Sequence, residues 1–462
     1  MKVKAKILSL ILLISLLTSC APRRFDQLMA RRAQFTYKRE GLVLTDGKFH
    51  PDEIEEFSVD EYLKWYEGLK SPLKLELPDP KKPKELTKDE MIEDFEFLFK
   101  ELKENYPFFE VLKRRHKIDF VKSHDKYLTM VKKAKTDEEF IETLKMIIGD
   151  LKSDHAKIAD KAYVKETLEY FAQNFKSPSI YYEFLNLNRS VVRNRYDLKG
   201  KQSDEDNIDL NRRRDIFETA DPNNLSFEDL GKGLGLIKIK EMAGVSKYSE
   251  DLKVLKDFLK NKHLYKALII DIRGNSGGNE DYWQNFLLPK LLTSPKKVTN
   301  SLFFKDSDKT KLIFADENLN AERLENMDTS ALNISNTKDI EGFDLYMKDI
   351  ISISPDKSDR DYGFDGEIFI LVDKEVYSAA EGFTNFMKNS NAAILLGEQT
   401  KGDGITLGII NSVLPNSGLV FTYTNTLGFD SEGKLNEENP TKPDIETNSY
   451  KDSIRTIQEM IR

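Results

Sequence analysis

The chain has one cysteine in 462 residues, so no disulfide can form within it. An exported domain of this composition must therefore be held together by its apolar core alone. With 39% apolar and 32% charged residues, the chain can bury one large core or two ordinary ones. The composition is that of a globular protein and not of a disordered tail.

Clustered positive charge is also missing. The formal net charge is -8, and the lysines are scattered among as many acidic residues. Binding to phosphate backbones needs a concentrated positive surface, so we expect no nucleic-acid partner. The sequence has no P-loop and no paired His/Cys ligand spacing, and Gly231, Gly233 and Gly235 precede a strand where a dinucleotide loop would follow one. We therefore expect neither a metal nor an organic cofactor.

Long apolar runs are absent apart from one at the amino terminus. Met1–Lys6 is basic, and the apolar run Ile7–Leu17 is too short to span a bilayer comfortably, which is typical of a secretion signal. The run ends in Leu17-Thr18-Ser19-Cys20, which resembles a bacterial lipobox. The sequence predicts a signal peptide over residues 1–19 and a lipid on Cys20 that anchors the protein to a membrane of the cell envelope. A plain signal peptide with an incidental cysteine is the alternative.

Composition and periodicity divide the rest of the chain. Residues 20–84 form an amino-terminal extension and linker, which ends in the proline-rich stretch Leu77–Pro83. A helical subdomain follows over 85–159, with helices expected from the capping box at Thr87, over 119–134 and from the capping box at Thr136. Two further stretches are polar: 160–230, predicted as an insertion or lid, and 306–365, predicted as a surface insertion.

A strand, helix, strand pattern begins the remaining α/β core, predicted over 231–450. Gly235–Ile239 alternates like a strand, Tyr248–Asn261 has the spacing of an amphipathic helix, and Ala267–Asp271 is a continuous apolar strand. A carboxyl-terminal helix is expected over 451–462.

Glycines follow the buried strand directly, in Asp271–Asn279. Three glycines at the carboxyl end of a strand let the backbone approach a ligand and direct N–H groups at it. Gly277 and Gly278 are the candidates for these donors. A tight strand-to-helix turn with no ligand is the other interpretation.

A serine stands at a second strand-to-helix turn. The apolar strand Ile368–Val372 leads into Val376–Phe383, which begins a helix at or near Ser378. This geometry exposes the hydroxyl and directs the first free helical N–H groups at whatever the hydroxyl attacks. Ser378 could therefore be a nucleophile, although a serine in this position is also a common helix N-cap.

One histidine lies where it could reach across a cleft. His155 comes just past a helix end, in Ser153-Asp154-His155-Ala156. The other histidines have charged helical or loop surroundings and are interpreted as solvated: His50, His116, His124 and His263. An ordinary surface role for His155 also remains open from its local sequence.

Four short motifs, in order, resemble the C-terminal-processing and tricorn-core serine peptidase family over about residues 85 to 450. They are Asp271–Gly278, Ser378-Ala379-Ala380-Glu381, Gly397–Gly402 and Pro443-Asp444-Ile445. The resemblance implies an α/β (α+β) fold with a ClpP/crotonase-like β-α-β core sheet behind an amino-terminal helical subdomain. It implies a serine endopeptidase that cleaves exported proteins or peptides.

The family has two base systems, and the sequence indicates which one to expect. The serine-lysine branch has its lysine where this chain has Asp403, and Lys401 lies two residues early. The tricorn-like branch takes a histidine from the helical subdomain, which His155 resembles. Its third member is a glutamate before the Pro-Asp-Ile element, which by spacing corresponds to Glu437, with Glu438 as the alternative.

The resemblance thus implies a Ser378–His155–Glu437 triad. A neutral imidazole can take and return a proton near neutral pH, which a serine hydroxyl needs. The oxyanion would be met by N–H groups of Ala379 and of Gly277 or Gly278.

The polar interval 160–230 lacks the glycine-rich carboxylate-binding loop of a PDZ module, so no PDZ domain is predicted. The substrate class therefore stays a peptide or exported protein of unspecified sequence. A lipoprotein that binds a peptide or apolar ligand on the same scaffold, without cutting it, is the competing hypothesis.

Overall fold

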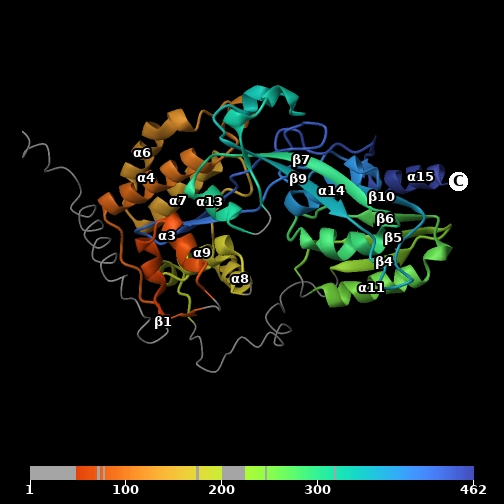
Figure 1. Cartoon of the computed structure of the whole chain (residues 1–462), viewed down its shortest axis with the longest axis horizontal. Coiled ribbons are helices and arrows are strands. Elements are labelled where there is room, and N and C mark those ends of the chain that lie inside the picture. The colour runs from red at the N-terminus through yellow and green to blue at the C-terminus, as the bar shows by residue number, and fades with distance from the viewer. Residues whose placement is uncertain are drawn as a thin grey trace, which may run out of the picture.

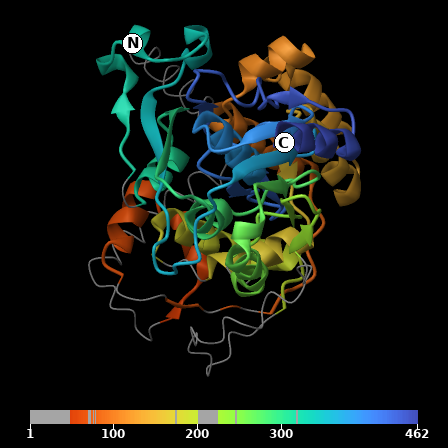
Figure 2. The same ribbon diagram turned by 90° about the vertical axis from the view of Figure 1, so that its right-hand side faces the viewer.

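A computed structural model describes residues 48–69, 73–75, 77, 79–172, 176–199, 224–244, 247–316 and 319–461. The predicted signal peptide and Cys20 lie outside the described residues. Figure 1 shows a lobe of helices on one side and a lobe built on a sheet on the other, with long strands β7 and β9 running between them. Figure 2 shows the carboxyl-terminal helix at the outer end of the sheet lobe.

The sheet lobe is organised around six strands in the order β15-β11-β10-β6-β5-β4. All neighbours are parallel except the pair β4 and β5. The strands are β4 (Leu225–Asp229), β5 (Leu234–Ile239), β6 (Ala267–Asp271), β10 (Glu367–Val372), β11 (Ile394–Gly397) and β15 (Ile445–Glu446). The predicted strands at the start of the core are thus present, and β6 is buried along its whole length.

Helices cover both faces of this sheet, which explains why its central strands are continuously apolar. Leu268 and Ile270 face the cluster formed with α11, η5, α12 and α14, whereas Ala267 and Ile269 face α15. The helices are α11 (Tyr248–Lys260), η5 (Tyr282–Leu287, a π-helix), α12 (Leu288–Leu291), α14 (Ser378–Asn389) and α15 (Tyr450–Met460). Both the amphipathic helix and the carboxyl-terminal helix expected from the sequence form.

The helical subdomain contains one helix more than predicted. It consists of α4 (Lys88–Asn105), α5 (Phe109–His116), α6 (His124–Lys133) and α7 (Asp137–Gly149). Thr87 forms the expected capping box with Glu90. Pro107 ends α4, as expected, but the chain resumes as α5, which buries Val111 and Leu112 against the same core.

The prediction of a polar insertion or lid at 160–230 is wrong for residues 161–195, which form three helices. They are α8 (Lys161–Phe171), α9 (Pro178–Leu187) and α10 (Ser190–Arg195). Asp160 and Ser177 cap the first two, and Val164, Leu187 and Val192 pack against Val413 and Val420 of the core. Enough apolar residues are interspersed among the polar ones to bury one face of each helix.

Part of the predicted extension also packs on these helices. Residues 48–69 and 73–75 contain β1 (Lys48–Phe49), η1 (Pro51–Glu56), α3 (Val59–Tyr66) and β2 (Lys74–Leu75). Tyr62 is fully buried against α9, and its hydroxyl donates to the Pro178 carbonyl at 2.8 Å. This segment therefore belongs to the fold and is not only a linker.

The interval 306–365 is likewise more than a surface insertion. It supplies β9 (Leu345–Ile353), which pairs with β7 (Lys296–Phe304) along nine residues of each strand. Their sheet has the order β14-β7-β9-β8, with β8 (Glu322–Arg323) and β14 (Leu427–Phe429) at its edges. Tyr346, Met347 and Ile353 of β9 are buried, but Lys348, Asp349 and Ser352 stand between them in the sequence and interrupt the apolar pattern of the strand.

A small sheet joins the helical lobe to the sheet lobe. Its order is β12-β13-β3, from β12 (Ile410–Val413), β13 (Val420–Tyr423) and β3 (Lys157–Ile158). The remaining described elements are α13 (Asp308–Phe314) and short 3-10 turns, η2 (Val121–Ser123), η4 (Lys262–Leu264), η6 (Leu324–Asn326), η7 (Thr329–Ala331) and η8 (Thr337–Ile340). Pairing of β3 with β13 attaches the end of the helical subdomain to the core.

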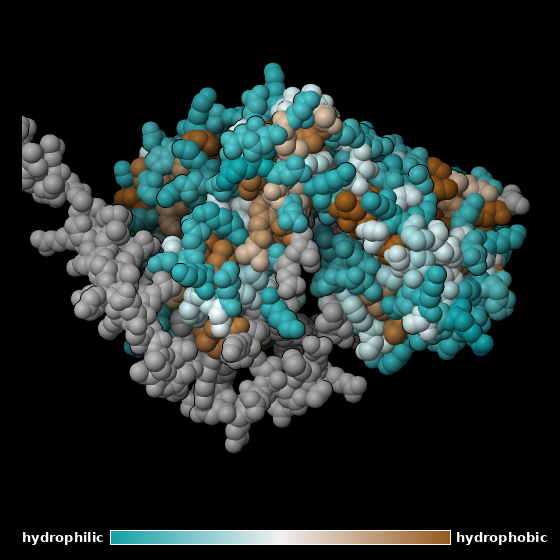
Figure 3. Space-filling view, in the orientation of Figure 1, coloured by the Kyte–Doolittle hydropathy of each residue, from teal (hydrophilic) through white to brown (hydrophobic). Residues whose placement is uncertain are grey.

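The outer surface is mainly hydrophilic in the view of Figure 3. The large apolar side chains that are exposed come from separate elements, among them Phe97, Met146, Leu264 and Ile350. Within the described ranges, helices are either too short or too polar to cross a bilayer.

Candidate active site

Ser378 is the first residue of α14, directly after the turn that follows β10. Its φ of 53° lies in the left-handed region, which is strained for a residue with a side chain. The N-cap position belongs to Tyr377, and no side chain caps the helix there. The hydroxyl of Ser378 is therefore not used as a cap, and its half-buried side chain is left available at the turn.

His155 reaches this serine from the other end of the chain. Its Nε2 lies 3.0 Å from the Ser378 hydroxyl oxygen, although 223 residues separate the two in sequence. The hydroxyl of Thr422 on β13 donates to the His155 carbonyl at 2.7 Å, and β3 begins two residues later. The pairing of β3 with β13 thus sets the position of the imidazole, whose side chain is buried.

Asp403 holds the other nitrogen of the imidazole. Its Oδ2 lies 2.7 Å from His155 Nδ1 and accepts a second hydrogen bond, of 3.0 Å, from the Tyr377 hydroxyl. Burial, followed by the charge of Asp403, raises the pKa of Tyr377 well above its ordinary value, so this hydroxyl stays a donor. Asp403 itself is buried and adopts a φ of 52°. Asp403, His155 and Ser378 form one chain of hydrogen bonds: carboxylate, imidazole and hydroxyl.

The glycine loop after β6 packs directly beside Ser378. A Cβ on Gly277 would lie 2.8 Å from the Ser378 Cβ, so only glycine fits there. Asn275 is fully buried; its side-chain oxygen accepts the Gly277 N–H at 3.0 Å, and its carbonyl accepts the Tyr377 N–H. The amide of Gly277 is thereby occupied.

Two backbone amides remain available beside the serine. Neither the Gly278 nor the Ala379 N–H has an acceptor among the described residues, and Gly278 is exposed. Of the donors expected from the sequence, Gly278 and Ala379 thus have free amides, whereas Gly277 has a partner. This arrangement combines a hydroxyl, a base within hydrogen-bond distance, a carboxylate that orients the base, and free N–H groups, which is the equipment for acyl transfer.

The model of peptidase family S41 matches residues 233–447, which include Ser378, Asp403 and the glycine loop. These residues form an S41 domain. The enzyme is a serine-type peptidase, with the mixed α/β fold expected from the sequence. His155 lies before the matched segment, on the helical subdomain that packs against the S41 domain.

Solved structures with a similar arrangement include mature CPAF, with 14% identity, a TM-score of 0.49, and coverage of 81% of this chain and 96% of that one. A lipoprotein from Streptococcus agalactiae has 14% identity and a TM-score of 0.42, with 80% and 96% covered. The photosystem II D1 C-terminal processing protease has 13% identity and a TM-score of 0.39, with 79% and 94% covered. A search of curated proteins gave no match.

The S41 domain does not place Glu437 on the imidazole, which corrects the sequence-based prediction of the third member. The site that Glu437 was expected to occupy belongs to Asp403. The position of Gly402 accounts for this difference. Its carbonyl accepts the Ser378 N–H, so the next residue, Asp403, lies beside the imidazole, whereas the Glu437 Cα is 3.6 Å from where a Cβ on Gly402 would lie. The position that holds the lysine in the serine-lysine branch is therefore in the site here, but it carries the carboxylate of Asp403.

The alternatives named from the sequence of the S41 domain also have other partners. Glu438 forms an ion pair with Arg114 at 2.6 Å. Lys401 forms an ion pair with Asp154, and its ammonium lies 5.4 Å from the centre of the Tyr377 ring. Neither contacts Ser378 or His155 through a hydrogen bond among the described residues.

Glu381, the third residue after Ser378, ties the loops of the S41 domain together. Its buried carboxylate accepts hydrogen bonds from Asn436 at 2.7 Å and from the Thr441 hydroxyl at 2.7 Å. Asn436 in turn accepts the Gly404 N–H at 2.8 Å. These hydrogen bonds tie the backbone next to Asp403 to the first turn of α14. Glu381 is therefore a residue that positions the Asp403 loop.

Glu437 lines a separate cavity of about 150 Å³ with Tyr106, Leu151, Tyr377 and Lys401. Its Oε2 has no hydrogen-bond partner in the described structure. Burial, and then the charge of Asp403, raises the pKa of Glu437 well above its ordinary value. The protonated, uncharged form of Glu437 is thus favoured more in the folded protein than in the unfolded chain.

Glu437→Gln should therefore raise thermal stability, by an amount that grows with pH. In the wild type, the unfolded chain loses this proton at a lower pH than the folded chain, so stability falls as pH rises from the unfolded pKa to the folded pKa. The amide cannot titrate and avoids this loss, which is at most about 1.4 kcal/mol per pH unit. Melting temperatures at pH 4, 6 and 8 measure the effect. An equal difference between the two proteins at all three values would contradict it.

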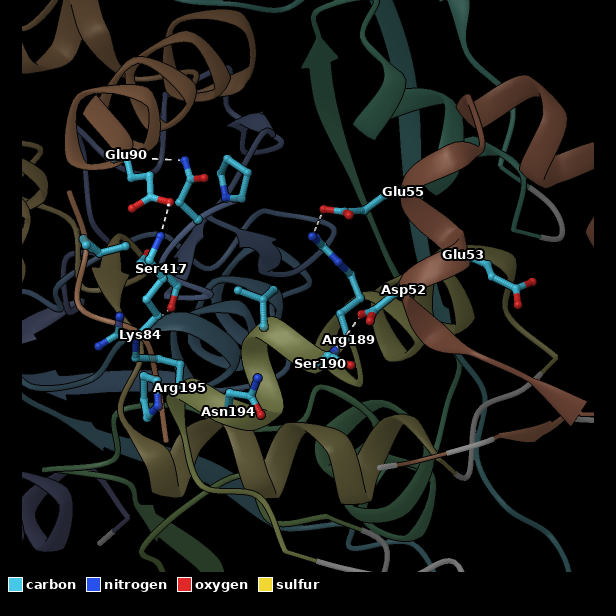
Figure 4. A pocket seen from close by; sticks show the side chains of 15 residues that line it. Asp52, Glu53, Glu55, Lys84, Glu90, Arg189, Ser190, Asn194, Arg195 and Ser417 are labelled. Atoms are coloured by element: carbon cyan, nitrogen blue, oxygen red, sulfur yellow. Dashed lines mark hydrogen bonds and ion pairs between the residues drawn. The ribbon is translucent and has the colours of Figure 1, made fainter. Parts of the chain in front are cut away.

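Another cavity, of about 510 Å³, lies away from the S41 site, between the extension and α10. Figure 4 shows Arg189 directed at Glu55 and Asp52 beside Ser190, whereas Glu53 points away from them. Arg189 forms an ion pair with Glu55, and the Ser190 N–H donates to Asp52 at 2.7 Å.

Across the described ranges, no group of three or more His, Cys, Asp or Glu side chains is arranged to hold a metal ion.

Proposed function

We propose that this S41 domain hydrolyses peptide bonds through an acyl-enzyme formed on Ser378, with His155 as the general base and Asp403 as its orienting carboxylate. The observation that carries the proposal is the continuous hydrogen-bond chain from Ser378 through His155 to Asp403. A hydroxyl becomes nucleophilic at neutral pH only if a neighbouring base takes its proton.

In the proposed first step, the Ser378 oxygen attacks the peptide carbonyl as His155 Nε2 takes the hydroxyl proton. Asp403 accepts a hydrogen bond from the Nδ1–H. This bond selects the tautomer whose Nε2 carries no proton, and it stabilises the imidazolium that forms. His155 then gives its proton to the leaving amine, and the acyl group stays on Ser378. Water, activated by the same imidazole, releases the acid and regenerates the hydroxyl.

The negative oxygen of the tetrahedral intermediate would be met by the N–H groups of Gly278 and Ala379. Both amides lack other partners in the described structure, and Ala379 is at the amino-terminal end of α14. A donor of this kind contributes about 3 to 4 kcal/mol to stabilising the transition state. The left-handed conformation of Ser378 supports this role because it turns the chain sharply from strand to helix.

The activity is tested by incubating the purified mature protein with an unfolded protein and identifying new amino termini by mass spectrometry. We expect internal cleavage that stops when a serine-directed phosphonate is added. Persistent absence of cleavage by folded enzyme, across several unfolded substrates, would favour a binding role for the cleft.

We further propose that the enzyme is exported and anchored to a membrane of the cell envelope by a lipid on Cys20, where it cleaves exported proteins or peptides. The basic start, the short apolar run and the ending Leu17-Thr18-Ser19-Cys20 support this location. A lipid on the first mature residue would leave the whole folded part outside the bilayer.

Cys20→Ser should abolish this anchoring, because Cys20 is the only thiol that can carry a thioether-linked lipid. We expect either an uncleaved precursor or release of the protein into the soluble exported fraction. Membrane fractionation and mass spectrometry of the amino terminus distinguish these forms from the wild type. A cleaved Cys20→Ser chain that stays on the membrane as fully as the wild type would contradict the anchor.

A further inference from the structure

A further cavity, of about 300 Å³, lies beside the proposed active site and is lined by acidic, neutral polar and aliphatic side chains. Its walls come from the start of η5, from β7 and β9, and from the loop that follows Asp403. Figure 1 shows β7 and β9 passing next to α14, in agreement with the contact between β7 and α14. None of the proposed catalytic steps uses this cavity.

The cavity is close to Ser378 through the first turn of α14. The Glu280 Oε1 is 3.6 Å from the position that a Cβ on Gly382 would take, and Gly382 is one helical turn after Ser378. One turn advances about 5.4 Å along a helix. Glu280 also follows Gly278 by two residues, and Gly404, which follows Asp403, forms part of the wall. The cavity thus lies about one helical turn from Ser378.

Two carboxylates in this cavity have no cationic partner among the described residues. Glu280 accepts one hydrogen bond, from Gln284 at 3.0 Å, and Asp349 accepts one, from Asn300 at 3.1 Å. No lysine, arginine or histidine is among the described residues that line the space. Negative charge without a counter-charge, partly removed from water, is costly unless a cation joins it.

Asn300 provides an independent indication that a donor is missing. This residue is 3% exposed, and its Oδ1 is buried without any hydrogen-bond partner in the described structure while the residue lines the cavity. Buried amide oxygens are nearly always paired in native proteins. A ligand with N–H groups would supply donors to the two carboxylates beside Asn300.

We infer that this cavity receives a lysine or arginine side chain of the peptide substrate, at a position next to the cleaved bond. An ammonium or guanidinium supplies both the positive charge and several donors. Ile350, which lines the cavity and is exposed, offers an apolar contact for the aliphatic part of such a side chain. The inference rests on the proposed peptidase activity and specifies its substrate class.

The preference for a basic side chain should depend on pH. Burial, and then the charges of Asp349 and Asp281, raises the pKa of Glu280 to about 8, while Gln284 hydrogen-bonds to its carboxyl group. Glu280 in the empty cavity is thus largely protonated at pH 6.5 and largely ionised at pH 9, whereas a lysine side chain stays charged at both values. The preference for lysine over an uncharged side chain of equal length should therefore increase with pH.

The test compares peptides that differ only in lysine or norleucine at one position beside the scissile bond, after a peptide library has located the cleavage sites by mass spectrometry. For the wild type we expect a kcat/KM about tenfold or more higher with lysine, because a charged hydrogen bond in a partly buried site is strong. The double variant Glu280→Gln/Asp349→Asn should reduce the preference to within about twofold while still cleaving the norleucine peptide. Glu322→Gln, an exposed carboxylate on β8 of the same sheet, is the matched control and should keep the wild-type preference.

Three outcomes would overturn the inference. One is a wild type that prefers norleucine or shows no preference, and another is a double variant that keeps the full lysine preference. A preference that appears only with added calcium or magnesium and disappears with chelator would assign the cavity to a metal ion instead. Covalent labelling of Ser378 by a fluorophosphonate separates these failures from failure of the peptidase itself: a labelled enzyme without basic preference leaves the proposed function standing. A folded enzyme that takes no label would contradict both the basic preference and the proposed peptidase activity.

Discussion

Ser378→Ala should reduce the turnover of peptide substrates by about 10⁶-fold, to the level left by substrate binding and the free amides alone. The hydroxyl is the atom that attacks, and the described structure offers no second nucleophile within hydrogen-bond distance of His155. Initial rates with one internally quenched peptide, measured for the variant and the wild type, give the ratio. Circular dichroism should show the same fold for both.

His155 and Ser378 are proposed to act as one unit, so the losses caused by removing each should not multiply. His155→Ala should cost a similar factor, and the double variant Ser378→Ala/His155→Ala should be no slower than either single variant. Because His155 is buried, its removal leaves a small void, and unfolding experiments must show that the variant is folded under assay conditions. Losses that multiply in the double variant would mean that the two side chains work independently.

Asp403→Asn is expected to have a smaller but still large effect, a loss of about 10⁴-fold in kcat. The amide would hydrogen-bond to Nδ1 with the wrong polarity and favour the tautomer whose Nε2 carries the proton and cannot accept another. Asparagine is a conservative replacement here, because it tolerates the left-handed φ of 52° at this position. The kcat and KM of the variant, measured with the same peptide, should show the loss in kcat.

Glu437→Gln is the matched control for Asp403→Asn. Glu437 lies near Asp403 but makes no hydrogen bond to His155 in the described structure, so its amide should keep activity within a few-fold of the wild type. A loss of about 10⁴-fold in Glu437→Gln, together with an active Asp403→Asn, would restore the triad implied by the family resemblance. That outcome would require the loop carrying Asp403 to move before catalysis.

Local patterns were sufficient for the elements that carry the nucleophile and the glycine loop. The apolar runs Ala267–Asp271 and Ile368–Val372 indicate buried strands because helices cover both faces of their sheet. Ser378 and His155 could be named because each comes at the end of a regular element, where a side chain is free to act. Their contact over 223 residues agrees with that choice of residues.

The identity of the carboxylate could not be determined from spacing. Glu437 was selected by its distance along the chain from Pro443, but the residue that reaches Nδ1 is decided by the turn at Gly402 and the left-handed backbone at Asp403. The signal that was present is chemical: an acid occupies a position where the other branch places a catalytic lysine. In this chain that position points at His155, so the acid there takes the orienting role.

Segments with a strong polar face were the ones misinterpreted. In 161–195 and in β9, charged and polar residues are interspersed in the sequence among the apolar residues that face the core. The sequence alone also could not reveal the acidic cavity, because Glu280, Asn300 and Asp349 come from three separate segments. Only the pairing of β7 with β9 places Asn300 opposite Asp349.

Activation of Ser378 by His155 and Asp403 is the central claim, and fluorophosphonate labelling with peptide mass spectrometry tests it most directly. Labelling reports activation of the hydroxyl without requiring the natural substrate. We expect rapid modification at Ser378 in the wild type and in Glu437→Gln, and little or none in His155→Ala and Asp403→Asn. A folded wild type that takes no label at Ser378, or variants of His155 and Asp403 that are labelled as fast as the wild type, would contradict it.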